Sequence, residues 1–463
     1  MQQEARLIEG PVARTLIRLS APMVIAMFAM VGFNIVDTFY VGRLGVEPLA
    51  AMGFTLPLVL SVNSISLGIG VGTTAVVAQA IGRRDSAGVQ RFALSSLLLG
   101  ITVSSTMAIA GLLGGRALFT MLGAEGAVLE HVLQYTSVWF FGLPLVVVPQ
   151  NGNSSIRAAG DTKTPAKIML TALTINAILD PLFIFGWGPV SAYGLRGAAM
   201  ATVFSQACAM TLTLLVLHRR GILVRVKLTV AEVLSAWKRI LKIGLPAAVT
   251  QLIAPVSTAA ITALVAGYGV AAVAGFGVAT RLESFAVMVI NAIGAALVPF
   301  VGQNWGAGKK ARVSRAVKTA LVMTASWGAF VWLLSLVVGR QAAAVFNEDP
   351  DVVGVVMSYM AIVFPSYALL GVLVTTLNAF NALHRAMRSL VLSVLRMLVL
   401  YVPLAYVGSA LFGLGGVWWA AFTSNAVAGV VAVLWFRHLF HRMETEPPPD
   451  VWDTDSEYEA VGM

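Results

Sequence analysis

The sequence has few of the residues on which metal proteins and most enzymes depend. Of its 463 residues one is a cysteine, Cys208, and five are histidines. A single cysteine excludes an internal disulfide and a cysteine-based zinc cluster, and no two histidines stand at metal-ligand spacing. The chain also lacks a G-x-x-x-x-G-K-[ST] sequence, so it has no nucleotide-hydrolysing site of that type. We expect neither an enzyme nor a resident metal or cofactor.

Charge is scarce as well, whereas apolar residues are abundant. Charged residues make up 11% of the chain and hydrophobic residues 58%, a balance that a water-soluble core cannot accommodate. The sequence therefore predicts an all-α membrane protein with twelve transmembrane helices. The twelve apolar stretches, each about 20 residues or longer and thus able to cross a bilayer, lie near residues 15–39, 50–77, 92–113, 132–150, 166–186, 197–217, 241–265, 271–300, 316–338, 353–379, 390–408 and 416–436.

The two halves of the chain are related by an internal repeat. Residues 17–91 align without a gap on residues 241–315, at a constant offset of 224. Matched pairs include Pro22 with Pro246, Gly70 with Gly294, Gln79 with Gln303, and Gly82 with Gly306. Because each half has an even number of spans, both halves enter and leave the membrane on the same side, as parallel repeats do.

These patterns divide the chain into four parts. The segment 218–242 is basic and amphipathic, which is typical of a helix that lies along the inner membrane surface. The last residues are acidic and contain a proline triplet, a composition typical of disorder. We therefore predict an N-terminal six-helix lobe at 1–217, a cytoplasmic linker at 218–240, a C-terminal six-helix lobe at 241–443 and a disordered acidic tail at 444–463.

The basic residues predict the orientation. Most of the 31 Lys and Arg lie at the N terminus, in alternate connections, including 380–396, or after residue 436. By the positive-inside rule, both termini are then cytoplasmic, in the cytoplasmic (inner) membrane. Topology and attraction to anionic lipid explain the net charge of +10 without nucleic acid. We expect no cleaved signal peptide and a monomer. The five exceptions are Arg43, Arg116, Arg196, Arg340 and, within a predicted span, Arg281.

Three acidic residues fall inside predicted spans: Asp37, Asp180 and Glu283. A charge at the middle of a transmembrane helix costs roughly 2.5 to 3.5 kcal/mol, so each of them needs a reason to be there. Asn176 shares a helix face with Asp180, and Pro181 withholds an amide from a backbone carbonyl. If Asp37 and Asp180 meet, this group of oxygen atoms suits a proton or a sodium ion.

Each of these acids has a structural alternative. Asp37 would also fit a headgroup-level position close to Arg43, and Asp180 fits such a position less well. Glu283 follows Arg281 by two positions, which points the two side chains apart on a helix, and it either ties the C-terminal bundle together or faces a substrate. Further candidate contacts for a substrate in a cavity between the lobes are Gln251 and Asn291.

Several motifs occur together and in order, and the chain resembles the multidrug and toxin extrusion (MATE) transporters through them, over roughly residues 10–440. The motifs are NIVDTFYVGRLG (34–45), AQAIGRRDSAG (78–88), GDTKTP (160–165), NAILDPLFIFG (176–186), GLRGAAMATVFSQ (194–206) and QNWGAGKKARV (303–313).

This resemblance implies a MATE-type fold and an antiporter that exports cationic amphipathic compounds in exchange for protons or sodium by alternating access. The cation site of the family's N-terminal lobe matches Asp37, Asn176, Asp180 and Thr202. The spans at 241–265 and 353–379 contain no acid, so the chain looks closer to the DNA-damage-inducible-like (DinF-like) branch. That placement favours protons over sodium, although these ligands suit either ion.

Three other functions are weaker expectations. A flippase of lipid-linked oligosaccharides would keep the architecture, but it must hold a pyrophosphate with cationic side chains, and Arg281 is the only basic residue in a predicted span. An intramembrane aspartyl protease also uses two acids, but the sequences around Asp37 and Asp180 do not resemble its signatures. A passive channel would leave the uneven distribution of acids unexplained.

Overall fold

The computed structural model describes residues 5–223 and 227–445, and these are almost entirely helical. The first half contains η1 (Arg6–Ile8), α1 (Val12–Gly42), α2 (Val46–Gly82), α3 (Ser86–Met121), α4 (Gly126–Ala158), α5 (Lys163–Phe185) and α6 (Leu195–Arg219). The second half contains α7 (Val230–Ala266), α8 (Val270–Gly306), α9 (Lys310–Phe346), α10 (Pro350–Val363), η2 (Phe364–Ser366), α11 (Tyr367–Ala382), α12 (Ala386–Val394), the π-helix η3 (Leu395–Tyr401) and α13 (Val402–Thr445). The one β-bridge in the described residues joins Trp187 and Val190.

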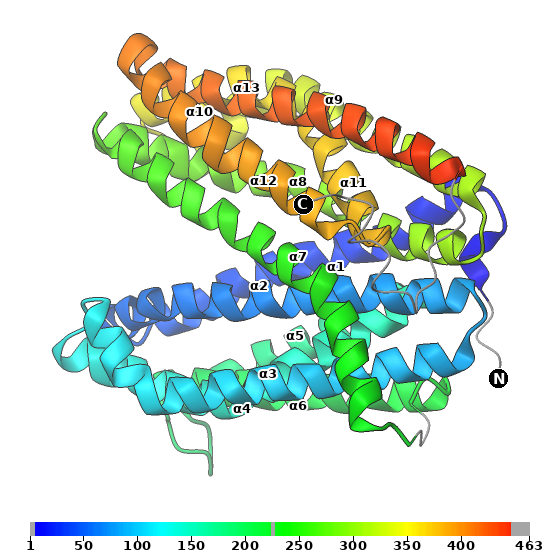
Figure 1. Ribbon diagram of the computed structural model, residues 1–463. Helices are drawn as coiled ribbons and strands as arrows, with labels where there is room; N and C mark the ends of the chain where they lie inside the picture. Colours follow the sequence, from blue (N-terminus) through cyan, green and yellow to red (C-terminus); the bar gives the residue numbers. More distant parts are fainter. Residues whose placement is uncertain (1–4, 224–226, 446–463) are drawn as a thin grey trace.

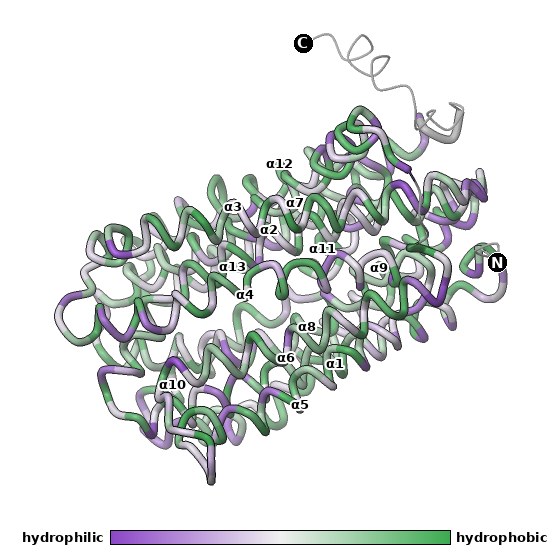
Figure 2. Tube along the Cα trace, turned by 90° about the horizontal axis from the view of Figure 1, so that it is seen from below, coloured by the Kyte–Doolittle hydropathy of each residue, from purple (hydrophilic) through white to green (hydrophobic). Residues whose placement is uncertain are grey.

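The helices are those of a multi-pass membrane protein. In the described part of the chain, 11 helical segments are long and apolar enough to cross a bilayer. Figure 2 shows hydrophilic residues gathered toward the two ends of the bundle, with mostly hydrophobic tube between them. The last segment, Ala386–Arg442, is 57 residues long, or roughly 85 Å if helical throughout, which far exceeds one bilayer core. It is interrupted at Gly413, where the backbone is not helical (φ 60°, ψ −146°).

The repeat seen in the sequence extends to the helix boundaries. Both ends of α2 and α8 are related by the same offset as the sequence repeat, and so are the first residues of α3 and α9. The turns repeat as well: Arg84 (φ 61°) matches Gly308 (φ 71°), and Gly160 (φ 85°) matches His384 (φ 61°). A left-handed backbone is therefore required at the same place in each half, whichever residue occupies it.

The two groups of helices meet along α2, α7 and α8. Figure 1 shows α1–α6 on one side and α8–α13 on the other; the ribbons lie closest at the end that holds the N terminus and diverge toward the opposite end. A Cβ added at Gly68 would lie 2.4 Å from the backbone oxygen of Gly244, and one at Gly72 would lie 2.3 Å from that of Ile240. Glycine therefore lets α2 and α7 pack with their backbones in contact.

The predicted separate surface helix at 218–242 is wrong. A capping box formed by Thr229 and Glu232 starts α7, which then runs without a break to Ala266. The amphipathic stretch is thus the first part of α7, and it packs against the N-terminal half, where the Trp237 indole N–H donates to the backbone oxygen of Ser95 (2.8 Å). The predicted acidic tail lies outside the described residues from residue 446 onward.

The turn before α5 is held by Asp161 of the GDTKTP motif. Its carboxylate accepts from the backbone N–H of Lys163 (2.9 Å) and of Thr164 (3.0 Å), and Arg220, just after α6, forms an ion pair with it. Partial burial alone would raise the pKa of Asp161, but the bonds from Thr164 and Arg220 outweigh burial and hold the pKa below its ordinary value. This carboxylate therefore fixes the start of α5 relative to the end of α6.

Candidate functional site in the N-terminal half

The structure brings Asp37, Asn176 and Asp180, three of the predicted residues, together between α1 and α5. These two helices pack against each other. Asn176 and Asp180 lie one turn apart on α5, and the Asn176 amide donates to Oδ1 of Asp180 (2.8 Å). Both side chains are buried. Pro181 follows directly, yet α5 continues to Phe185. The carboxyl group of Asp37 on α1 lies within hydrogen-bonding reach of Asp180.

One oxygen atom of this group has no donor. Oδ2 of Asp180 is buried and accepts no hydrogen bond within the described structure. Two ionised carboxylates cannot bond to each other, because neither has a hydrogen to donate. A proton on either Asp37 or Asp180, or a cation between them, would supply the missing partner. The arrangement can therefore accept one positive charge.

Arg43 does not neutralise the pair. Its guanidinium lies over the ring of Phe39, 4.6 Å from the ring centroid, and none of the ion pairs found between described residues joins it to Asp37. The alternative in which Asp37 is a headgroup-level partner of Arg43 thus has no support in the structure.

Thr202 and Tyr135 stand differently toward these acids. Thr202, on α6, is partly buried, and its backbone oxygen accepts from Ser205 (2.8 Å); no hydrogen bond in the described structure links its hydroxyl to Asp180, so its role stays a prediction. Tyr135, on α4, is buried and lies within electrostatic range of both Asp37 and Asp180. Sequence analysis missed Tyr135 because a lone aromatic residue in a span is usually packing.

A second polar cluster lies inside the C-terminal half, around Glu283. The hydroxyl of Tyr359, on α10, donates to the Glu283 carboxylate (2.5 Å). Arg396 is close enough to Glu283 for their charges to interact, and its Nε donates to Asn425 (2.8 Å). The Asn425 amide in turn donates to Ser366 (2.8 Å). Glu283 thus has a guanidinium within electrostatic range, whereas Asp37 and Asp180 have no described Lys or Arg so placed.

The assignment of Arg396 to a cytoplasmic connection is wrong. Arg396 lies in the π-helical segment η3, within the apolar segment Ala386–Arg442. Arg281 is therefore not the only basic residue within a span. The apolar run beginning near residue 390 hides this position in the sequence, because nothing local marks where the connection ends and the span begins.

Gln251 and Asn291 are both exposed, and the structure gives neither of them a hydrogen bond to Glu283.

Within residues 5–223 and 227–445, three or more His, Cys, Asp or Glu side chains do not gather as they would around a metal ion. Asp37, Asn176 and Asp180 carry oxygen atoms of the kind that bind a sodium ion.

An all-helical membrane protein with two matching halves and carboxylates gathered inside one of them has the features of a membrane transporter. A family model described as MatE matches residues 22–182 and, a second time, residues 246–407. The chain belongs to this family, MATE. The starts of the two matches are related by the offset of the sequence repeat, so each half is recognised independently as a copy of the same unit.

Relatives match along nearly the whole chain. A FAD transporter of Shewanella oneidensis is 34% identical over 93% of this chain and 95% of its own length. A probable multidrug resistance protein of Bacillus subtilis, YpnP, is 26% identical over 93% of this chain and 96% of its own. The crystal structure of the Vibrio cholerae MATE transporter VcmN in the bent form has a TM-score of 0.87 at 28% identity and covers 93% of this chain and 97% of its own.

Proposed function

We propose that this protein is an exporter of amphipathic organic compounds, driven by an ion gradient that acts on Asp37 and Asp180. The observation that carries the proposal is the buried Asp180 oxygen without a donor beside a second carboxyl group. Binding one proton there removes the charge repulsion, and releasing it on the other side of the membrane restores it. A single charge moved across the membrane is worth about 2.3 kcal/mol per 100 mV, which can drive uphill export.

The architecture that we propose is twelve crossings in two six-helix lobes, at 1–217 and 241–443, joined through 218–240. The break at Gly413 supports it, because it divides the longest apolar segment into two. The lobes would act as parallel repeats in the cytoplasmic membrane, with both termini inside and no second copy required. The wall between them would open alternately to each side.

We propose protons as the coupling ion and a place in the DinF-like branch. The C-terminal half has Ile261 where the N-terminal half has Asp37, and it contains no acid between residues 352 and 443, which leaves the coupling to the N-terminal half. A proton supplies the donor that Asp180 lacks without any change in ligand geometry. Sodium would require further oxygen ligands, of which Thr202 is the candidate.

Everted membrane vesicles with separately imposed proton and sodium gradients test this proposal. We expect a proton gradient alone to drive movement of a fluorescent cation in vesicles that contain the protein. Movement driven by a sodium gradient alone would mean that sodium, and not the proton, is the coupling ion at the same site. Equal movement in empty vesicles would refute transport altogether.

The cargo has two main candidates and a third, weaker one. Multidrug-type relatives such as YpnP support cationic amphipathic compounds, which we take as the first. The FAD transporter of Shewanella oneidensis raises a dinucleotide anion as the second, and Arg396 is the observation in its favour. An anion needs a basic partner in the membrane interior, and a guanidinium suits a phosphate group. The same residue weakens one argument against a lipid-linked oligosaccharide flippase, which stays a third alternative.

Competition distinguishes the cargoes. In vesicles that transport a fluorescent cation, a second cation should compete while FAD should not, if the first candidate is correct. If FAD competes, and Arg396→Gln removes that competition while Arg281→Gln does not, the cargo is the anion and Arg396 is part of its site. Arg281 is the matched control because it lies in the same half but is exposed.

A further inference from the structure

Two glutamines, one from each half, bond across to the other half at the end of the molecule that holds the N terminus. The Gln79 amide, near the end of α2, donates to the backbone oxygen of Ala382 at the end of α11 (3.0 Å). The Gln303 amide, near the end of α8, donates to that of Ala158 at the end of α4 (2.7 Å). The two donors are equivalent positions of the repeat, and so are the two acceptors, so the contact is reciprocal. Both glutamines are buried.

The backbones of α2 and α8 touch at the same place. A Cβ on Gly82 would lie 2.1 Å from the backbone oxygen of Gln303, and one on Gly306 would lie 2.3 Å from that of Gln79. Only glycine fits at either position. The two halves therefore cannot separate at this end without breaking the hydrogen bonds that the Gln79 and Gln303 amides donate.

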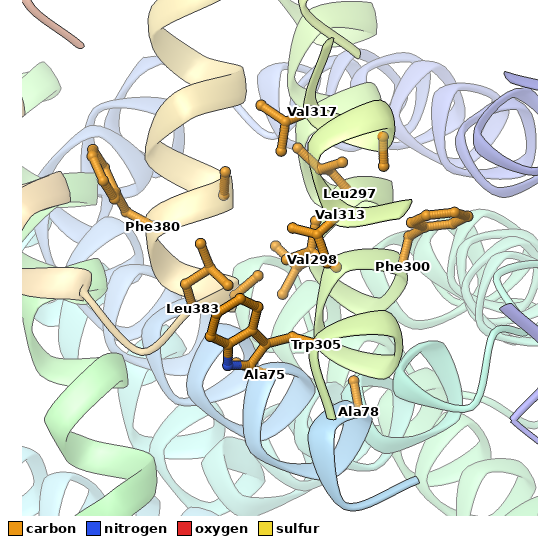
Figure 3. Close-up of a cluster of buried hydrophobic side chains, with 14 of the residues drawn as sticks. Ala75, Ala78, Leu297, Val298, Phe300, Trp305, Val313, Val317, Phe380 and Leu383 are labelled. Carbon is orange, nitrogen blue, oxygen red and sulfur yellow. The ribbon is translucent and has the colours of Figure 1, made fainter. Parts of the chain in front are cut away.

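An apolar layer from both halves surrounds these bonds. Figure 3 shows Ala75 and Ala78 of α2 with Trp305 of α8 and Leu383 after α11, and all four belong to one buried cluster. Such a layer excludes water, and a hydrogen bond between neutral groups is strongest where water cannot replace it. Once this end opens, water can solvate the freed carbonyls, so the bonds stabilise the closed arrangement selectively.

The N-terminal segment reinforces one of the two bonds. The backbone N–H of Leu7 donates to Oε1 of Gln303 (3.1 Å), and Asn304 donates back to the oxygen of Leu7 (3.0 Å). Arg312 donates to the backbone oxygen of Gly10 (2.9 Å). This segment belongs to the N-terminal half but is tied to the C-terminal half, and of the two glutamines it bonds Gln303.

We propose that Gln79 and Gln303 form a reciprocal clamp that holds this end of the transporter shut, and that both bonds break each time the halves rock to open it. The inference rests on the alternating access proposed above. It assigns a function to the matched glutamines of the repeat, which the ion site does not use. Removing the clamp favours the opposite arrangement, in which the other end closes.

Distances across that other end report the shift. Val46 and Val270 are repeat-related, begin α2 and α8 at the end remote from the clamp, and are 84% and 87% exposed. Spin labels at V46C and V270C, in a Cys208→Ala background, give a distance distribution in lipid nanodiscs. Gln79→Met with Gln303→Met keeps the side-chain size but removes both donors. We expect the ratio of short to long distances to rise about tenfold, the size expected for one or two net hydrogen bonds.

Gln90 supplies the matched control. Its amide donates to the backbone oxygen of Gly221 (3.3 Å), two residues after α6 ends and not in the C-terminal half, so Gln90→Met should leave the distribution unchanged. Gln303→Met alone should shift it more than Gln79→Met alone, because it also frees the N-terminal segment. An unchanged distribution in the double variant, with a wild-type helical circular dichroism spectrum, would overturn the clamp.

The distances are measured without cargo, so the two proposals fail separately. An unshifted double variant overturns the clamp even where wild-type vesicles transport normally. A shifted double variant supports the clamp even where wild-type vesicles show no gradient-driven transport, a result that refutes the proposed function instead.

Discussion

The two halves of the molecule share the boundaries of α2 and α8 and the turns at Gly160 and His384, but they place their acids differently. Tyr135 on α4 and Tyr359 on α10 are equivalent positions of the repeat, and each faces an acid. In the N-terminal half the acids are Asp37 and Asp180, from α1 and α5; in the C-terminal half the acid is Glu283, from α8. Duplication thus preserved the interior position of the tyrosine while the charge facing it came from another helix.

The surroundings of these acids differ even more than their positions. Glu283 accepts a hydrogen bond from Tyr359 and lies in the field of Arg396. Asp37 and Asp180 have no ion pair with a Lys or Arg in the described part of the chain. Glu283 thus already has a donor and a nearby guanidinium, whereas two carboxyl groups at one site need a proton or a cation between them. The comparison therefore supports the proposal that Asp37 and Asp180, and not Glu283, take part in coupling.

Introducing an acid at the equivalent position of the second half should strongly destabilise the protein. Ile261, the equivalent of Asp37, is fully buried, and its neighbours do not include an Asp180 equivalent. Ile261→Asp should cost about 3 to 5 kcal/mol of stability because it buries a charge without a partner. Thermal unfolding in detergent measures the loss, with Ile261→Val as the control. A variant as stable as wild type would mean that the C-terminal half contains a water-filled site where we see packing.

Removing the two tyrosine hydroxyls should have unequal effects. Tyr359→Phe takes away the donor to a Glu283 oxygen and should cost about 1 to 3 kcal/mol. Tyr135→Phe should cost less than about 1 kcal/mol, because the Tyr135 hydroxyl makes no described hydrogen bond to Asp37 or Asp180. The same unfolding experiment compares them. Equal losses would remove the distinction between the two acid sites.

The matched turns predict a smaller, pH-dependent difference. Burial, together with the positive charges of the surrounding basic side chains, lowers the pKa of His384 to about 3. Below about pH 6.5 the unfolded chain takes up a proton at His384, whereas the folded protein keeps this side chain neutral. The contribution of His384 to the free energy of unfolding is therefore fully present above about pH 6.5 and declines as the pH falls toward 3. The basic side chains are Arg83, Lys242, Arg239 and Arg385.

Between pH 6.5 and pH 5.5, the free energy of unfolding should thus fall by about 1 kcal/mol because of His384 alone. His384→Asn, which tolerates the left-handed backbone, should reduce the slope by that amount. Gly160, at the equivalent turn, has no titratable side chain, and Gly160→Asn serves as the control with an unchanged slope. Identical slopes in wild type and His384→Asn would show that His384 is charged in the folded protein.

Much of this structure follows from the sequence, and the exceptions have physical causes. The apolar runs and the internal repeat predict the helices, because a bilayer imposes a minimum length and a duplication copies the turns. Asp37 and Asp180 stand out because lipid tolerates few charges. Tyr135 does not stand out alone, although its match with Tyr359 in the repeat is a signal that could have found it.

The failures are all matters of continuity along a helix. Residues 230–240 are basic and amphipathic, and nothing local shows that they continue into α7 and not along the membrane surface. Arg396 follows a basic connection, and its hydrogen-bond partner Asn425 is 29 positions away in the sequence. Which partner compensates a charge is decided by tertiary packing, which the local sequence does not record.

The most direct test is transport in proteoliposomes under an imposed proton gradient, with Asp37→Asn, Asp180→Asn and Glu283→Gln compared with wild type. We predict that either asparagine variant lowers gradient-driven transport by roughly a hundredfold, as expected when a proton-carrying group is removed, while Glu283→Gln still responds to the gradient. Wild-type rates in both asparagine variants would contradict the account.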